Sequence, residues 1–161
     1  MTDDDVHFLS RKINLIGSSM PSNPSLLSSP KQRHGGDYEK IAADFLQQQG
    51  LVVLAKNWQQ PNVGEIDLIL LHPEKAWNTL VFAEVRKRKV SNYGDALMSI
   101  TQAKQRKLIK TARFFLRHHP NYAHLECRFD VVAFNEQVGV SEAHKFIQPE
   151  WVQGAFIANA W

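Results

Sequence analysis

The sequence predicts an α/β fold in which a mixed β-sheet is flanked by helices, in the order α-β-β-β-α-β-β. Two stretches place apolar residues three and four positions apart, which is the spacing of a helix that packs on a core. Between and after them lie short runs rich in β-branched residues, and such runs favour strands. The length of 161 residues and the hydrophobic content of 43% fit one domain with a sizeable core.

Two helices are expected. The first runs over residues 37–49 and ends at Gly50, because a glycine commonly follows the last helical residue. The second begins after Thr101, which is a good N-cap, and runs to about His118. Their apolar stripes comprise Ile41, Ala42, Phe45 and Leu46 in the first helix and Leu108, Ile109, Ala112, Phe115 and Leu116 in the second.

Five strands are expected from short apolar runs bounded by polar, Gly or Pro residues. The second and third runs are separated by a short turn that contains Pro73, so they are expected to pair as a hairpin. The expected strands are 51–56, 63–71, 79–86, 128–134 and a short last one at 145–148.

Composition divides the chain into three parts. Residues 17–34 are rich in Ser and Pro and cannot bury enough apolar surface to offset their chain entropy, so residues 1–35 are expected to be a flexible extension. The domain itself is expected over residues 36–148. Residues 149–161 are apolar and are expected to form a C-terminal tail.

The single cysteine, Cys127, excludes an intramolecular disulfide and suits a reducing compartment. No apolar run approaches the roughly 18 residues that span a bilayer. The acidic start, Met-Thr-Asp-Asp-Asp, has the wrong charge for a secretory signal. We therefore expect a cytoplasmic protein that does not use a membrane.

Basic residues gather in one window of the chain. Residues 86–117 hold ten of the nineteen Lys and Arg residues and one acid, Asp95, so the window carries +9 and the rest of the chain −6. This asymmetry indicates a polyanionic partner more strongly than the total charge of +3 does. A solvated basic helix face is the alternative.

Two carboxylates, Asp67 and Glu84, lie inside otherwise apolar strands, where charged side chains are seldom buried unless they are paired. Strand alternation is expected to place Ile66, Leu68 and Leu70 on one face and Asp67 on the other. If the second and third strands pair, the two carboxylates approach each other.

The crowding of these carboxylates would need relief. At about 4 Å and an effective dielectric constant near 20, their repulsion would be roughly 4 kcal/mol. A divalent metal, a protonated carboxyl or an ion pair with Arg86 would each reduce it. Oxygen ligands on adjacent strands suit Mg²⁺ or Mn²⁺.

Several segments together resemble the bacterial YraN family, and the resemblance covers about residues 35–135. The combination of the GEIDLI and FxEVxxR segments carries most of its specificity. The matching residues lie in Gly36–Gly50, Asn57-Trp58, Gly64–Ile69, Val81–Arg88, Lys104–Lys107 and Arg128–Val132.

That family belongs with the restriction-endonuclease-like folds, and its nearest relatives are Holliday-junction resolvases. The resemblance implies a restriction-endonuclease-like core in which Glu39, Asp67 and Glu84 bind the metal, with the Val85 carbonyl as a fourth ligand. Arg86 stands where the superfamily pattern has a lysine. An arginine stays charged and cannot act as a base, but it can hold a phosphate. The catalytic residues implied are Asp67, Glu84, Arg86 and Glu39.

The second helix gives an independent argument for a phosphate partner. Cations in the first turns of a helix oppose its macrodipole, so a helix built only for stability would have Glu there. Together with the free backbone amides of the first turn, the cations at the start of this helix are expected to bind phosphate groups of a nucleic acid, independently of its base sequence. The expected nucleic-acid-binding residues are Gln102, Lys104, Arg106 and Lys107.

Other polar residues are assigned to structure. Asp130 is expected to pair with Arg128 or a helix, and His118 with His119 to complement the dipole at a helix end.

Three functions compete. The first is a Mg²⁺- or Mn²⁺-dependent phosphodiesterase acting on DNA, including branched or damaged DNA. The alternative on the same fold is a non-catalytic nucleic-acid-binding module, with Arg86 marking lost catalysis. The third is a protein-interaction domain that docks through the segment 151–161. Nucleic acid, above all DNA, is the expected partner, and a homodimer stays open.

Overall fold

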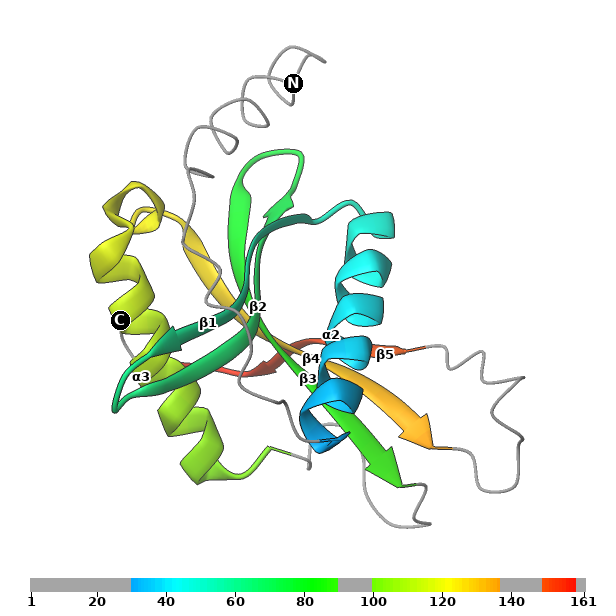
Figure 1. Ribbon diagram of the computed structural model, residues 1–161. Helices are drawn as coiled ribbons and strands as arrows, with labels where there is room; N and C mark the ends of the chain where they lie inside the picture. Colours follow the sequence, from blue (N-terminus) through cyan, green and yellow to red (C-terminus); the bar gives the residue numbers. More distant parts are fainter. Residues whose placement is uncertain (1–29, 90–99, 137–148, 159–161) are drawn as a thin grey trace, which may run out of the picture. The chain divides into compact units, whose positions relative to one another are not determined.

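The computed structural model describes residues 30–89, 100–136 and 149–158 (Figure 1). This part of the chain follows the order α-β-β-β-α-β-β, so the predicted fold class is confirmed. The elements are α2 (Pro30–Gln48), β1 (Val52–Gln60), β2 (Gly64–Pro73), β3 (Asn78–Lys89), α3 (Gln102–His118), the 3-10 turn η2 (Pro120–Tyr122), β4 (Glu126–Glu136) and β5 (Glu150–Phe156).

The five strands form one mixed sheet in the order β1-β2-β3-β4-β5. The β1–β2, β2–β3 and β4–β5 pairs are antiparallel, and β3 and β4 are parallel. The predicted hairpin of the second and third strands is therefore confirmed. The parallel pair is the longest, with β3 matched to β4 from Thr79 to Lys89.

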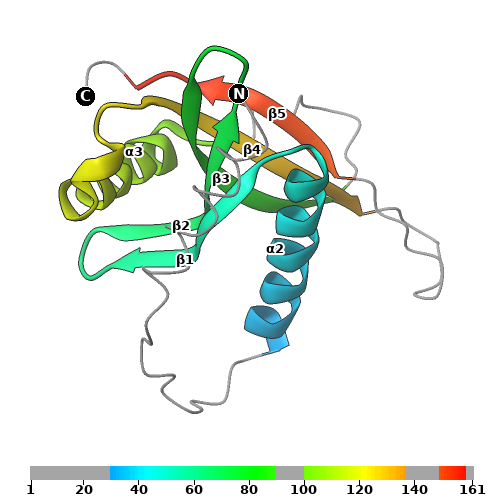
Figure 2. The ribbon, with the colours of Figure 1, turned by 90° about the horizontal axis from the view of Figure 1, so that it is seen from above.

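The two helices cover opposite faces of the sheet, as Figure 2 shows. Ala42, Ala43 and Leu46 of α2 pack on one face in a cluster that includes Leu68 and Val132. The residues of α3 that pack on the other face are Leu108, Ala112 and Phe115, with Ile69, Leu80, Phe82 and Phe129 of the sheet. Burial on both faces explains why the central strands are almost continuously apolar.

α2 begins earlier than predicted and ends where predicted. It starts at Pro30 rather than at Asp37. Gly35 and Gly36 are weak helix formers, costing about 1 kcal/mol each relative to alanine, and they suggested a boundary that the helix passes through. Proline is compatible with a first helical turn. At the other end, Gly50 has a φ of 91°, a left-handed conformation that favours glycine.

β2 and β3 diverge at one point, which can be followed in Figure 1. The pairing of β2 with β3 ends at Leu68 and Ala83. From there towards Gly64, β2 pairs with β1 alone, and towards Lys89, β3 pairs with β4 alone. The backbone N–H of Val85 donates instead to Oδ2 of Asp67, at 2.7 Å. We call this divergence, with Asp67 on β2 and Glu84 on β3, the strand fork.

Near the strand fork, Ile66 packs on a different face of the sheet from Leu68 and Leu70. Ile66 packs in the cluster beneath α3, whereas Leu68 and Leu70 pack in the cluster beneath α2. The prediction that these three residues share one face is therefore confirmed for Leu68 and Leu70 and wrong for Ile66. At Asp67 a side-chain acceptor replaces the regular ladder. The β2 residues before it, Gly64 and Ile66, lie against α3.

The last strand lies where an apolar tail was expected. β5 spans Glu150–Phe156 and pairs with β4, while the predicted strand at 145–148 lies outside the described residues, as do residues 1–29. Trp151, Val152 and Phe156 pack against the sheet, so these apolar side chains contribute to the core. Within the segment 151–161, to which a docking role was assigned, the structure describes residues 151–158, and Trp151, Val152 and Phe156 of these are used by the core.

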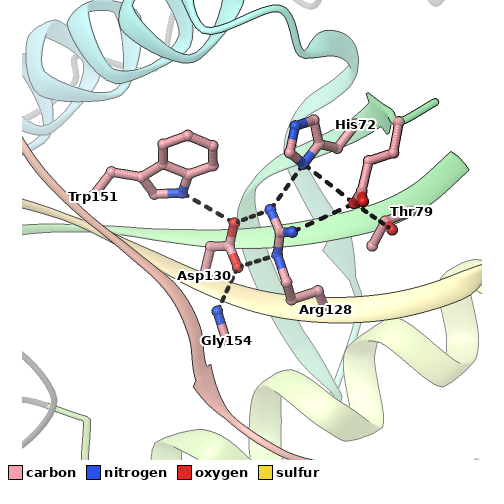
Figure 3. A network of polar contacts seen from close by, with 7 residues as sticks. His72, Thr79, Arg128, Asp130, Trp151 and Gly154 are labelled. Atoms are coloured by element: carbon pink, nitrogen blue, oxygen red, sulfur yellow. Dashed lines mark hydrogen bonds and ion pairs between the residues drawn. The ribbon is translucent and has the colours of Figure 1, made fainter.

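A buried polar network ties β5 to β4, as Figure 3 shows. Asp130 accepts hydrogen bonds from Nε1 of Trp151 and from the backbone N–H of Gly154, both at 3.0 Å. Its carboxylate also receives Nε and Nη2 of Arg128, at 2.9 and 3.0 Å. Because a guanidinium only donates, Nδ1 of His72 is the acceptor of the remaining Arg128 bond, at 3.2 Å.

The contact between β2 and α3 predicts the effect of a small substitution. A Cβ on Gly64 would lie 2.7 Å from Oγ1 of Thr111 and 3.0 Å from Cε of Lys107. Thr111 is fully buried, and its hydroxyl donates to the Lys107 carbonyl at 2.8 Å, so it is not free to move aside. Gly64→Ala is expected to lower the free energy of unfolding by about 1–3 kcal/mol in a urea titration.

The matched control for this change is Gly36→Ala. Gly36 lies in α2, and a Cβ there would meet no atom of the described residues within 4 Å. This substitution is expected to raise the free energy of unfolding by about 0.5–1 kcal/mol, because alanine favours the helix. Equal effects of the two substitutions would contradict the close approach of β2 to α3.

Candidate functional site

The first carboxylate of the strand fork is Asp67. Burial, followed by the charge of Glu84, raises the pKa of Asp67 from 3.8 to about 7. The hydrogen bond from Val85 and the charge of Lys104 act in the opposite direction, and Glu39 adds a smaller repulsion. The carboxyl is thus held in a place where its charge is costly, and a nearby positive charge would favour it.

The second carboxylate, Glu84, is more deeply buried, with 6% of its surface exposed. One oxygen, Oε1, lies 2.9 Å from Nζ of Lys104. The other, Oε2, is buried and receives no hydrogen bond from the described part of the chain. A buried acceptor without a partner costs about 1–3 kcal/mol, and more when it is charged. The strand fork therefore holds more negative charge than its own donors satisfy.

Lys104 reaches the strand fork from the first turn of α3. Its position is fixed by the helix start, where its backbone N–H donates to Oγ1 of the predicted N-cap Thr101, at 3.3 Å. Gln105 strengthens that start by donating from Nε2 to the Ile100 carbonyl at 3.1 Å. The sequence assigned Lys104 to phosphate binding and missed its pairing with Glu84. A lysine in a first turn without acids was the available signal, because the helix alone disfavours it.

Two of the expected site residues stand further from the pair. Glu39 on α2 is half-buried and acts on Asp67 through its charge. Arg86 on β3 is also half-buried, and within the described residues no ion pair joins it to Asp67 or Glu84. The cation that pairs with Glu84 is Lys104, so the ion pair with Arg86, one of the three ways of relieving the crowding, is not the pair that forms.

The residues of the strand fork suit a hard divalent cation with few protein ligands. No group of three or more His, Cys, Asp or Glu side chains in the described ranges is arranged to hold a metal. Mg²⁺, however, is usually held by one or two carboxylates, with waters and substrate phosphates completing its shell. Asp67 and Glu84, whose Oε2 has no hydrogen-bond partner among the described residues, match that pattern.

The solvent-exposed side of α3 is basic. Gln102, Arg106 and Lys107 are exposed on α3, and Lys110 continues the series one turn on. The first turn of α3 has no acid, so its free amides and these side chains form one electropositive surface. Lys104 is therefore paired with Glu84, whereas the other three expected phosphate ligands, Gln102, Arg106 and Lys107, are exposed to solvent.

Asp130 and the two histidines are used elsewhere. Asp130 pairs with Arg128, as predicted. Nδ1 of His118 lies 2.7 Å from the carbonyl oxygen of Phe114, and the ring of His119 lies 4.3 Å from that of Phe115. Burial lowers the pKa of His119. These residues stabilise α3 and the sheet and lie apart from the pair at the strand fork.

Comparison with other proteins identifies close relatives. A sequence profile described as "Uncharacterised protein family UPF0102" matches residues 38–134. A UPF0102 protein of Psychrobacter sp. (strain PRwf-1) is 68% identical, over 88% of this chain and 100% of that protein. A UPF0102 protein of Psychrobacter arcticus is 47% identical, over 100% and 99% of the two chains, and one of Alcanivorax borkumensis is 44% identical, over 80% and 95%. Within the described part of the chain, no helix is long and apolar enough to cross a membrane.

Proposed function

The chain belongs to the uncharacterised protein family UPF0102, which bears out its resemblance to the YraN family, and we propose that it is a metal-dependent nuclease acting on DNA. One observation carries the proposal: two crowded carboxylates, one with an unsatisfied buried oxygen, lie beside an exposed basic helix. The two carboxylates would be neutralised by a divalent cation, and the exposed Lys and Arg side chains of α3 would be neutralised by phosphates. Together these groups suit a metal ion and a phosphodiester.

Asp67 and Glu84 would hold Mg²⁺ or Mn²⁺ in this proposal, with Glu39 adding negative charge. When bound, such an ion polarises a phosphodiester and lowers the pKa of a bound water. The protein's own part is to fix the carboxylates: the Val85 N–H orients Asp67, and burial orients Glu84. Arg86 would contact a phosphate oxygen, because among the described residues its guanidinium has no ion pair with Asp67 or Glu84.

The proposal is tested by incubating the purified protein with linear, flapped and four-way DNA in Mn²⁺ and in Mg²⁺. Cleavage of at least one of these substrates is expected, and a chelator should stop it. Glu84→Gln, purified in the same way, should leave all substrates intact, which excludes a contaminating nuclease. A wild-type protein that cleaves none of them in either metal would contradict the proposal.

The basic surface of α3 gives a separate prediction. The double substitution Arg106→Ala, Lys107→Ala is expected to weaken DNA binding and to reduce the slope of log K against log salt by about 2, since each phosphate contact contributes about 0.9. Fluorescence anisotropy at several salt concentrations measures both quantities. The charge-matched control is Lys40→Ala, Lys75→Ala, which removes one exposed lysine from α2 and one from the turn between β2 and β3. An unchanged slope in the α3 variant would show that this surface does not contact phosphates.

The second candidate is a non-catalytic nucleic-acid-binding module. Arg86 favours it, because an arginine cannot exchange a proton as a lysine can at the position after Glu84-Val85. This reading predicts salt-dependent DNA binding without cleavage and little affinity for Mn²⁺.

A further inference from the structure

We propose that Lys104 is a built-in counter-cation of the strand fork, which takes the place of a divalent metal in the metal-free protein and weakens metal binding. The inference rests on the proposed metal site of Asp67 and Glu84, but it does not depend on whether that site cleaves DNA.

The two carboxylate oxygens of Glu84 have different surroundings. Its Oε1 receives the ammonium of Lys104 at 2.9 Å, and its Oε2 receives nothing from the described residues. Charge-assisted bonds of this length are among the strongest that a side chain makes. Lys104 therefore satisfies one half of a carboxylate whose other half is left unsatisfied, which leaves the strand fork incompletely neutralised.

Asp67, the other carboxylate of the strand fork, also lies near this ammonium. The ammonium of Lys104 lies against Glu84, and the N–H of the next residue, Val85, binds Asp67, so one positive charge stands beside both carboxylates. A divalent cation bound to these carboxylates would lie within a few ångströms of the ammonium. Like charges at that distance repel strongly in a site shielded from water, so metal and lysine oppose each other.

The position of Lys104 in α3 is unusual for a lysine. Lys104 lies in a first turn where a cation is unfavourable for the helix, yet its backbone is held by the cap at Thr101. Only 29% of its side chain is exposed. Its exposed neighbours Arg106 and Lys107 already supply charge to the surface. The location of Lys104 is therefore explained by the carboxylates rather than by the helix.

Removing the ammonium should strengthen metal binding. Lys104→Met keeps most of the aliphatic stem and removes the charge. We expect its Kd for Mn²⁺, measured by calorimetric titration of the full chain, to fall by about tenfold or more, which corresponds to about 1.4 kcal/mol. The melting temperature should fall without metal, because Glu84 loses its partner, and should then rise further on Mn²⁺ addition than that of the wild type.

Two variants separate charge from packing. Lys104→Arg keeps a positive charge at this position although its head group is larger, so its Mn²⁺ affinity should rise much less than that of Lys104→Met. Lys75→Met removes an exposed lysine from the turn between β2 and β3, and it should also leave Mn²⁺ affinity unchanged. Tighter binding in Lys104→Met alone supports the proposal. Unchanged or weaker binding in Lys104→Met, equal tightening in Lys104→Arg, or no Mn²⁺ binding by wild type and Lys104→Met overturns it.

The outcome is independent of the cleavage assay. Tighter Mn²⁺ binding in Lys104→Met without any wild-type cleavage would keep this inference and refute the nuclease. Cleavage by the wild type with no change of Mn²⁺ affinity in Lys104→Met would keep the nuclease and refute this inference.

Discussion

Replacing Asp130 with alanine is expected to lower the free energy of unfolding by about 3–5 kcal/mol. Asp130 is 1% exposed and accepts four hydrogen bonds, two from Arg128, one from Trp151 and one from Gly154. Alanine would leave a half-buried guanidinium and two donors of β5 without their acceptor. The measurement is urea unfolding followed by tryptophan fluorescence and by circular dichroism.

Two further variants make this prediction specific. Asp130→Asn keeps an acceptor but loses the charge that pairs with Arg128, so it is expected to lose less stability than the alanine variant and remains measurable if that one does not fold. Glu126→Ala removes an exposed acid from the same strand and is expected to change the free energy of unfolding by less than about 0.5 kcal/mol. A loss below about 1 kcal/mol in Asp130→Ala would mean that the network does not hold β5 to β4.

The sheet and its helices could be predicted because their signals are local. β-branched runs identified β1 to β4, and the spacing of apolar residues identified both helices. The start of α3 was also predicted, since Thr101 caps the backbone N–H of Lys104 as a threonine before an amphipathic run commonly does.

β5 was assigned to the C-terminal tail for a physical reason. Its sequence, Glu150–Phe156, is interrupted by Gly154, which has a φ of 59° and breaks the regular alternation of a strand. Its pairing with β4 is supported by the distant Asp130, which no local pattern reveals. The segment therefore resembled an unpaired apolar tail.

The candidate site was predicted only in part, because its residues meet through tertiary contacts. Asp67 and Glu84 were identified as polar residues inside apolar strands. The strand fork depends on one side-chain acceptor for Val85, and the pairing of Lys104 depends on where α3 docks. Neither follows from residue spacing.

Asp67→Asn is expected to abolish metal-dependent cleavage, with a loss of roughly 10²-fold or more, while the protein stays folded. Asparagine retains an oxygen that accepts the Val85 N–H, so the backbone at the strand fork should be preserved. It removes the negative charge that the proposed metal needs. Mn²⁺ should raise the melting temperature of the wild type and leave that of Asp67→Asn nearly unchanged.

The same substitution should change how stability depends on pH. The pKa of Asp67 is raised from 3.8 to about 7 in the folded protein, chiefly by burial and then by Glu84. The folded state therefore holds an extra proton between these values, and wild-type stability contributed by this group falls as pH rises from about 4 to about 7. Asp67→Asn lacks this decline, so without metal it should exceed the wild type by on the order of a few kcal/mol at pH 8 and by little at pH 4.

Chelated protein, unfolded in urea at pH 4, 6 and 8, tests the sign of this effect. A gap that opens in favour of Asp67→Asn as pH rises supports two crowded carboxylates that a cation relieves. A variant that is less stable at every pH, together with a wild type whose melting temperature ignores Mn²⁺, would mean that Asp67 is a structural partner of Lys104. The metal-dependent nuclease would then be excluded, and the nucleic-acid-binding module would account for the basic surface of α3.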